Sequence, residues 1–320
     1  MAAGHYSDET NAANSLAGLT KHVTDYLDEV VAAKARTADL VANASLVRAG
    51  ATANTVKIGT VTMDGLGTYS KNNGYPTGSV SLTWQTMELA YDRARQFNLD
   101  SVDLATKDDA LTAAYTMAEF VRQKVVPEID EVRLAKCFAG AASASQVTYG
   151  YTASAANVIG TIVDAIDTAR DGAMNEDNTV VYVDRALKTY IAKSSELTKT
   201  ADIKSGTKAL YTQVDEINGA KIVYCPSAYM KSEWTAYDGV TNGQTAGGLV
   251  AASGAKDISI MAVAGGCAQG VVAHNIARII TDPDDIDGVK VNYRIYHDLF
   301  VPANKAAGIC AVSSSAAPSS

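Results

Sequence analysis

Residues 55–100 read TVKIGTVTMDGLGTYSKNNGYPTGSVSLTWQTMELAYDRARQFNLD. At both ends of this stretch apolar and polar side chains alternate and several residues are β-branched, as in strands. Between them lies a cluster of turn-forming residues, Asn72, Asn73, Gly74, Pro76 and Gly78. These residue types favour turns because they adopt or stabilise tight backbone conformations. The stretch therefore predicts a long β-hairpin that is exposed or lies across a partner.

The longest helical pattern follows the hairpin and covers residues 106–142, where apolar residues fall near one stripe. Pro127 lies inside this run. A proline removes a hydrogen bond and clashes with the preceding turn, so we expect a kink or break near Val126. Gly140 is expected to end the helix.

The rest of the chain is organised around these two elements. Residues 16–31 have the spacing of an amphipathic helix, which predicts an N-terminal arm that packs on its own body or on a neighbour. Residues 150–230 alternate helical and strand patterns, which predicts a subdomain of mixed sheet and helices. Residues 235–255 are rich in Gly, Thr and Ser and predict a flexible loop, residues 258–312 predict strands, and residues 313–320 predict a polar tail.

The composition indicates a globular chain. Apolar residues make up 47% of the 320 residues and charged residues 19%, and the formal net charge is −8. An acidic chain is a poor candidate for tight binding of nucleic acid over its whole surface. No apolar run reaches the ~18 residues of a membrane helix, and no secretory signal is visible, so we expect a cytoplasmic protein without membrane contact.

The sequence contains no motif of a known catalytic or cofactor site: a P-loop, a dinucleotide fingerprint, a nucleophile elbow and an HExxH motif are all missing. The four cysteines lack metal-binding or disulfide-framework spacing and are expected to be buried thiols: Cys137, Cys225, Cys267 and Cys310. The acidic run at 282–287 departs from a calcium loop and predicts a turn. His297 and Asp298 are neighbours in a predicted strand and cannot easily face one another. We therefore expect that the protein is not an enzyme and binds no cofactor or metal ion.

Three blocks of the sequence resemble the major capsid proteins of tailed bacteriophages. In the first block the matching residues are Gly74, Tyr75, Gly78, Leu82, Thr83, Trp84, Asp92, Arg93, Arg95, Phe97 and Asp100. In the second they are Glu119, Phe120, Arg122, Val126, Pro127, Glu128, Asp130 and Arg133. In the third they are Tyr293, Arg294, Tyr296, His297, Asp298, Phe300, Val301, Asn304, Lys305 and Gly308. Each block alone is weak evidence for the family, but the three blocks together, in the order of the family, are fairly specific.

The resemblance implies an α+β fold of the Hong Kong 97 type. Such capsid proteins have an N-terminal arm, an extended hairpin called the E-loop, a peripheral domain with a long spine helix, and an axial domain. Mapped onto this chain, these parts are the arm at 1–52, the E-loop at 53–100, the peripheral domain at 101–150 and 256–295, the axial domain at 151–255 and 296–312, and the tail at 313–320.

The resemblance also implies the function. A protein of this family self-assembles into pentamers and hexamers, which form the icosahedral head that encloses the double-stranded DNA of the phage. It is a virion protein that assembles in the cytoplasm of the host bacterium. Its partners would be further copies of itself, a portal, a separate scaffolding protein, and DNA that it contacts weakly. A decoration protein is a further partner that the resemblance allows.

The hairpin carries the residues that we expect to make contacts between subunits. They are Leu66, Tyr69, Tyr75 and Trp84, with Arg93 and Arg95 holding acidic partners on a neighbour. The alternative is that some of them fold back on their own domain. Pro127 and the base of the hairpin would be the hinges when the shell expands. Lys71 at the hairpin turn could form a covalent cross-link, as in some capsids, but an ordinary turn lysine is favoured.

Two other functions stay open. One is an encapsulin, a bacterial compartment shell of the same fold that holds an enzyme cargo in place of a genome. The other is an α/β enzyme with an unrecognised site, which a monomer or small oligomer with a deep pocket would favour.

Overall fold

The computed structural model describes residues 34–41, 47–50, 54–72, 74–100, 109–173, 178–194, 214–280, 284 and 288–318. The expected helix at 16–31, most of the arm, and most of the acidic turn at 282–287 lie outside these residues. In the described part, no helix is long and apolar enough to cross a membrane.

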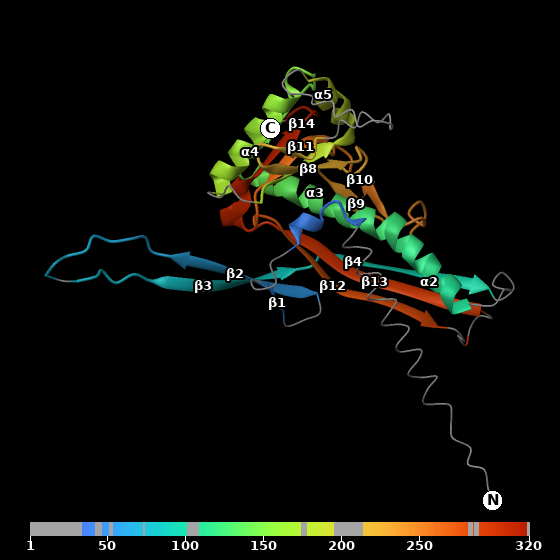
Figure 1. The fold of residues 1–320 in the computed structure, drawn as a ribbon. Helices are drawn as coiled ribbons and strands as arrows, with labels where there is room; N and C mark the ends of the chain where they lie inside the picture. The colour runs from blue at the N-terminus through green and yellow to red at the C-terminus, as the bar shows by residue number, and fades with distance from the viewer. Residues whose placement is uncertain are drawn as a thin grey trace, which may run out of the picture.

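The predicted hairpin is confirmed, and it projects from the rest of the molecule (Figure 1). Its sheet has the order β1 (Val47–Ala49), β2 (Thr55–Met63) and β3 (Val80–Glu88), and all neighbours are antiparallel. The base of the hairpin is anchored by a small apolar cluster of Val56, Leu89 and Val271. Leu89, the residue directly after β3, is buried in this cluster.

A second three-stranded sheet lies beside the base of the hairpin. Its antiparallel strands are ordered β12 (Gln269–Ile280), β13 (Gly288–Phe300) and β4 (Tyr91–Asp100). Strand β4 belongs to this sheet, so the expected hairpin range of 53–100 is too long. Alternate residues of β13 between Val289 and Ile295 are buried against the long helix, which covers this face.

The long helix is continuous through Pro127, and the expected break is wrong. Its parts are α2 (Asp109–Phe120), the π-helical η2 (Val121–Val125) and α3 (Val126–Ser143). The N–H of Val126 donates to the carbonyl of Val121, five residues back, and the backbone stays right-handed helical on both sides. The wider π turn just before the proline accommodates a residue that would otherwise clash with the preceding turn of an α-helix.

Gly140 lies inside α3 and does not end it. A Cβ atom at this position would lie 2.9 Å from Cγ1 of Val301. The glycine therefore allows close packing between α3 and the segment after β13, and the helix continues to Ser143.

The mixed sheet predicted for the centre of the chain is confirmed and has six strands. Their order is β5 (Val147–Thr148), β14 (Ile309–Ser313), β11 (Ile258–Val263), β6 (Val180–Asp184), β8 (Ala220–Cys225) and β7 (Glu216–Ile217). The pairs β5–β14 and β6–β8 are parallel, and the others are antiparallel. The predicted return to the peripheral domain at residue 256 is therefore wrong for β11. This strand pairs with β6 and β14 and not with the three-stranded sheet of β12, β13 and β4.

Both faces of the six-stranded sheet are covered. Tyr182 of β6 packs in the core shared with α3, whereas Val181 and Val183 pack in the core shared with α4 (Val158–Ala173). This explains why β6 is a continuous apolar run and does not alternate with polar residues. Three short helices complete this body, η3 (Arg185–Leu187), α5 (Lys188–Lys193) and η4 (Ala303–Gly308), and a 3-10 turn at the end of the arm, η1 (Ala38–Leu40), lies against α3.

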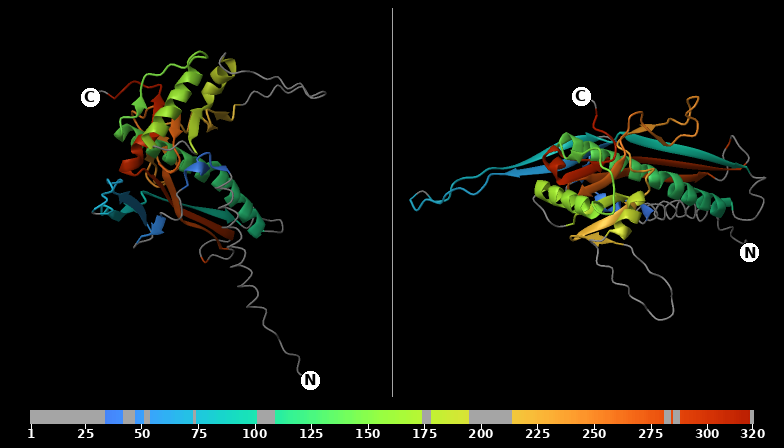
Figure 2. Two further views of the ribbon diagram at one scale, coloured as in Figure 1. Left: turned by 60° about the vertical axis from the view of Figure 1, so that its left-hand side comes forward. Right: turned by 90° about the horizontal axis from the view of Figure 1, so that it is seen from above.

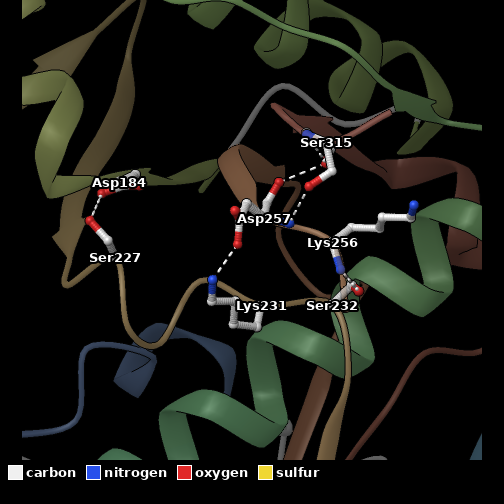
Figure 3. Close-up of polar contacts among 8 residues, drawn as sticks. Asp184, Ser227, Lys231, Ser232, Lys256, Asp257 and Ser315 are labelled. Atoms are coloured by element: carbon white, nitrogen blue, oxygen red, sulfur yellow. Dashed lines mark hydrogen bonds and ion pairs between the residues drawn. The ribbon is translucent and has the colours of Figure 1, made fainter. Parts of the chain in front are cut away.

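The segment at 235–255, expected to be a flexible loop, contains a short antiparallel ribbon of β9 (Trp234–Ala236) and β10 (Leu249–Ala251). The base of this ribbon is held by polar contacts (Figure 3). Lys231 forms an ion pair with Asp257, and the hydroxyl of Ser232 accepts a hydrogen bond from the N–H of Lys256 at 2.7 Å.

The C-terminal segment is partly integrated into the sheet and is not wholly a free polar tail. Ser313 is buried at the end of β14, and its hydroxyl donates to the carbonyl of Asp257 at 2.6 Å. The hydroxyl of Ser315 accepts from the N–H of Asp257 at 2.9 Å (Figure 3). The four cysteines are buried free thiols, as predicted.

Two glycines of α4 give a matched test of its packing. An alanine Cβ at Gly172 would lie 2.0 Å from the carbonyl oxygen of Ala307, whereas nothing lies within 4 Å of the same atom at Gly160. We expect Gly172→Ala to lower the free energy of unfolding by about 1–3 kcal/mol through overpacking. Gly160→Ala should raise it by about 0.5–1 kcal/mol through helix propensity. Urea unfolding of the unassembled chain measures both, and equal effects would contradict this packing.

Candidate assembly surfaces

The end of the hairpin exposes large apolar side chains. Leu66 is fully exposed, and Tyr75 and Tyr69 are 87% and 57% exposed, with their ring centroids 5.2 Å apart. The backbones of Ser70 and Gly74 exchange two hydrogen bonds, of 3.2 and 2.7 Å, which close the tip into a tight loop. Three of the residues predicted to contact a neighbour therefore lie together on a projecting tip that its own body leaves uncovered.

One face of the hairpin is also apolar, which the sequence reasoning missed. Val61 pairs with Leu82 and Met63 pairs with Val80, and all four side chains are exposed. Directly paired residues, and residues two apart along a strand, share one face of a sheet. The alternation in the two strands was the signal that could have identified this apolar face of Val61, Met63, Val80 and Leu82. Thr62, Ser81 and Thr83 occupy the opposite face, which is hydroxylated.

Trp84 continues the apolar face towards the base of the hairpin. The guanidinium carbon of Arg48 lies 4.4 Å from the centre of its ring, which is a cation–π contact. The ring also lies over Gly59 on the paired strand, where a Cβ atom would come within 3.2 Å. Part of Trp84 is therefore covered within the chain by the other two strands of the hairpin sheet.

Arg93 and Arg95 lie on β4 and not on the hairpin, so their expected location is wrong. Arg93 donates to Glu128 of α3 at 2.6 Å and to the carbonyls of Tyr237 and Gly248 at 2.8 and 3.0 Å. Arg95 donates to the carbonyl of Thr245 at 3.3 Å. Both guanidinium groups therefore hold the loop between β9 and β10 against β4 within one chain.

A cavity of about 530 Å³ lies beneath this loop, between β4, β13 and the long helix. Its apolar lining includes Phe97, Phe120, Pro127, Leu249 and Ile295. The polar lining is formed by Arg93, Arg95, Lys124, Glu128, Glu131, Tyr229, Tyr237, Asp238 and His297. Concave sites of this size, apolar with a few convergent polar groups, are typical of binding sites.

Glu128 and His297 form the buried polar centre of the cavity. Nε2 of His297 lies 3.8 Å from Oε1 of Glu128, and its ring stacks on Tyr91 with centroids 5.5 Å apart. Burial opposes the charge of Glu128, but hydrogen bonding with His297 and the charge of Arg93 hold its pKa below the ordinary value. Asp298 has different partners and accepts from the N–H of Ala90 at 3.1 Å, so the two neighbours do not form a catalytic pair.

Glu131 lies one turn further along α3 and is in a different situation. Burial and the nearby carboxylates of Glu128 and Asp130 raise its pKa to about 8. Among the residues that the structure describes, no ion pair joins Glu131 to a cation. The cavity therefore contains a carboxyl group whose charge its own chain does not balance.

Asp130 and Arg133 anchor the end of the arm to the long helix. The carboxylate of Asp130 accepts from the N–H groups of Arg36 and Thr37 at 2.9 and 3.0 Å and from the Thr37 hydroxyl at 2.7 Å. Arg133 donates to the carbonyl of Thr37 at 3.0 Å. Burial raises the pKa of Asp130, and these hydrogen bonds partly offset that rise. Two residues of the resembling block thus fix the arm to α3 at Arg36 and Thr37.

No family model matches the chain, and no match was found among curated proteins. Solved structures match it over most of its length. The capsid of cyanophage P-SCSP1u is 10% identical with a TM-score of 0.57, and the match covers 85% of this chain and 86% of the other. The mature capsid of bacteriophage PhiM1 is 14% identical with a TM-score of 0.51, over 81% and 82% of the two chains.

A virus-like particle from Pyrococcus furiosus is 11% identical with a TM-score of 0.51, and the match covers 91% of this chain and 98% of the other. At these identities the likeness shows the fold. The chain therefore has the α+β fold of phage capsid structures, which confirms the α+β class, while the division into the domains of the Hong Kong 97 type stays a prediction.

Glu131 predicts a specific pH dependence of stability. Its pKa is about 8 in the folded chain and starts from a reference value of 4.5. Between these values the folded chain holds a proton that the unfolded chain has released, so the contribution of Glu131 to stability falls as pH rises. Glu131→Gln should therefore stabilise the unassembled chain by about 1–2 kcal/mol at pH 8.5 and have little effect at pH 4.5.

Urea unfolding at the two pH values measures this difference, and Asp171→Asn on the exposed face of α4 is the matched control. A gain in stability that does not change with pH would show that the Glu131 carboxyl is not protonated in the folded chain.

Proposed function

We propose that this protein is the major capsid protein of a tailed bacteriophage, a structural protein and not an enzyme. The observation that carries the proposal is the projecting hairpin, whose tip and one face expose apolar side chains that its own body does not cover. Exposed apolar patches of this kind mark protein–protein contacts. The fold shared with phage capsid structures supports the same conclusion.

The hairpin and the body have different surfaces, so a contact between them is heterologous. Repeated heterologous contacts close into rings when the rotation between subunits allows it. Pentamers and hexamers made in this way would build an icosahedral head around double-stranded DNA. An interface of about 2,000 Å² or more, as obligate assemblies often have, would be supplied by the hairpin and the arm together.

The partners follow from this role. The protein would bind further copies of itself, a separate scaffolding protein and a portal, with a decoration protein as an additional outer partner. Its net charge of −8 suits weak contact with packaged DNA, because a strongly basic inner surface would hold the DNA tightly. The mature protein would be located in the virion, after assembly in the cytoplasm of the host bacterium.

A compartment shell of the encapsulin type is the second candidate, because the fold is also shared with a virus-like particle from Pyrococcus furiosus. The two candidates differ in what the shell encloses. Particles purified from the natural source would contain nuclease-protected double-stranded DNA if the protein is a phage capsid protein. An enzyme cargo without DNA would identify a compartment shell.

Electron microscopy of the purified protein, with sizing by light scattering, tests the proposed function. Closed icosahedral particles, or rings and tubes tens of nanometres across, are expected by analogy with closed symmetric assemblies. A stable monomer or dimer, even with a scaffolding protein supplied, would exclude a shell and favour an α/β enzyme whose site lies in the cavity under the β9–β10 loop.

The apolar face of the hairpin gives the sharpest variants for this assay. Leu82→Asn and Met63→Asn should reduce the yield of closed particles strongly, because they place an amide in a contact that excludes water. Thr83→Asn and Thr62→Asn change the opposite face of the same strands and should assemble as the unchanged protein does. All four should unfold in urea at similar concentrations, and equal losses of assembly on both faces would contradict a one-sided contact.

We also propose that Pro127 and the base of the hairpin are the hinges of shell expansion. A π turn next to a proline is a site where helices bend, and η2 ends one residue before Val126. Cryo-EM maps of precursor and DNA-filled shells should show the angle between α2 and α3 change. Identical angles in the two maps, with an unmoved hairpin base, would exclude both hinges.

A further inference from the structure

The cavity under the β9–β10 loop is enclosed by three elements of one chain. Arg93 and Arg95 of β4 hold the loop through the carbonyls of Tyr237, Gly248 and Thr245, and the long helix forms another wall. The loop lies beside β4 and the long helix, away from the hairpin, in Figure 1 and in the view from above (Figure 2, right). A cavity of about 530 Å³ under such a loop has the size of a small-molecule site.

Two polar groups that line this cavity lack a partner among the residues that the structure describes. Glu131 has no ion pair with a described cation. His297 is 1% exposed, and its Nδ1 has no hydrogen-bond partner. With the ring proton on Nε2, which faces Glu128 at 3.8 Å, Nδ1 is an acceptor. Because buried polar groups are normally hydrogen-bonded, the two acceptors indicate a ligand that donates hydrogen bonds.

The cations of the lining do not serve Glu131. Arg93 is engaged by Glu128 and by two loop carbonyls, and Arg95 by a third loop carbonyl. Lys124 lies seven residues before Glu131, which places the two Cα atoms roughly 10 Å apart along the helix axis. The positive charge that Glu131 needs therefore has to come from outside the described part of the chain.

The other titratable groups around Glu131 are acidic or neutral. Asp130 is engaged by the end of the arm, and Asp238 of the loop accepts from two N–H groups of its own turn. Tyr229 lies between β8 and β9, and burial together with the charge of Glu131 raises its pKa above the ordinary value. The Tyr229 ring is therefore close to the Glu131 carboxyl and remains a neutral phenol.

The rest of the lining favours an organic cation over a metal ion. It includes the aromatic rings of Phe97, Phe120 and Tyr237 and the aliphatic side chains of Pro127 and Leu249. Aromatic faces attract cations, and apolar side chains stabilise a buried alkyl chain. A metal ion needs several oxygen or nitrogen ligands, and the described residues contain no group of three side chains placed to hold one.

We propose that this cavity binds an alkylammonium ion, a small primary amine whose ammonium group pairs with Glu131 and whose alkyl chain lies against the aromatic wall. An ammonium group carries several N–H donors, so it can also serve other acceptors of the lining. The ligand would touch α3, β4 and the β9–β10 loop at once, and its binding would stabilise their junction. The site is separate from the apolar face of the hairpin, so it does not depend on the proposed shell function.

Isothermal titration calorimetry of the full, unassembled chain with n-butylammonium at pH 8.5 tests the site. A dissociation constant in the millimolar range is expected for a ligand this small. Butan-1-ol, the neutral molecule of the same length, should bind at least about tenfold more weakly, because it has no charge to pair with the carboxylate. Equal binding of the two would show an apolar cavity without ionic recognition and would overturn the proposal, as would a lack of binding by n-butylammonium.

A pair of matched variants locates the charge that the ligand recognises. Glu131→Gln keeps the shape of the side chain and removes its charge, so it should weaken n-butylammonium binding by about tenfold or more. Glu119→Gln makes the same change on the same helix, at a residue that is paired with Arg122 and lies outside the lining, and should bind as the unchanged protein does. Glu131→Asp keeps the charge and should fall between them. The proposal fails if Glu131→Gln binds with unchanged affinity.

The pH dependence of binding gives a test in the unchanged protein. The Glu131 carboxyl has a pKa of about 8 and holds its proton at pH 6.5, whereas the ligand needs the carboxylate. Affinity should therefore rise on the order of twentyfold from pH 6.5 to pH 8.5, and binding at pH 7 should release about one proton, which titrations in two buffers of different ionisation enthalpy measure. Both effects should vanish in Glu131→Gln. Affinity that is independent of pH, without proton release, would exclude pairing with Glu131 and leave the shell function untouched.

Discussion

The whole structure depends on one long helix that lies in two hydrophobic cores at once. The first part of α3 packs through Val126 and Ile129 against the three-stranded sheet, and its second part packs through Leu134, Cys137 and Phe138 against the six-stranded sheet. Strand β13 is shared in the same way, since Ile295 belongs to the first core and Leu299 to the second. The two sheets are therefore tied by buried apolar contact, and the β9–β10 ribbon and the arm are positioned against the same helix.

The hairpin, in contrast to the long helix, has almost no hydrophobic core of its own. It is anchored by Val56, Leu89 and Val271, and beyond this base it exposes an apolar face on a two-stranded ribbon. Such a ribbon is marginal in water and prone to non-specific association. In a protein that works as a monomer it would be a liability. An exposed apolar face of this kind is typical of a protein–protein contact, which is the physical reason for the assembly function proposed above.

The sequence predicted local elements well where a pattern had one physical cause. The hairpin, the alternation of helix and strand at 150–230 and the burial of the cysteines followed from residue alternation, helical spacing and residue type. The sequence patterns did not predict the features that depend on tertiary packing. Gly140 is a glycine because Val301 approaches it, and Pro127 is tolerated because a π turn precedes it. The two arginines of β4 looked like exposed contact residues, because the loop that engages them comes 144 to 155 residues later.

Three acidic residues near the start of α3 show how the parts of the chain meet there. Glu128 is balanced by Arg93 of β4, and Asp130 is satisfied by the arm at Arg36 and Thr37. Each of these carboxylates therefore joins α3 to a segment distant in sequence. Glu131 is the third, and no partner for it exists among the described residues. Leaving a half-buried carboxyl group unbalanced costs stability. Its two neighbours each join a segment to the helix, whereas Glu131 adds a charge that no described residue offsets, so it makes this junction of the chain sensitive to pH.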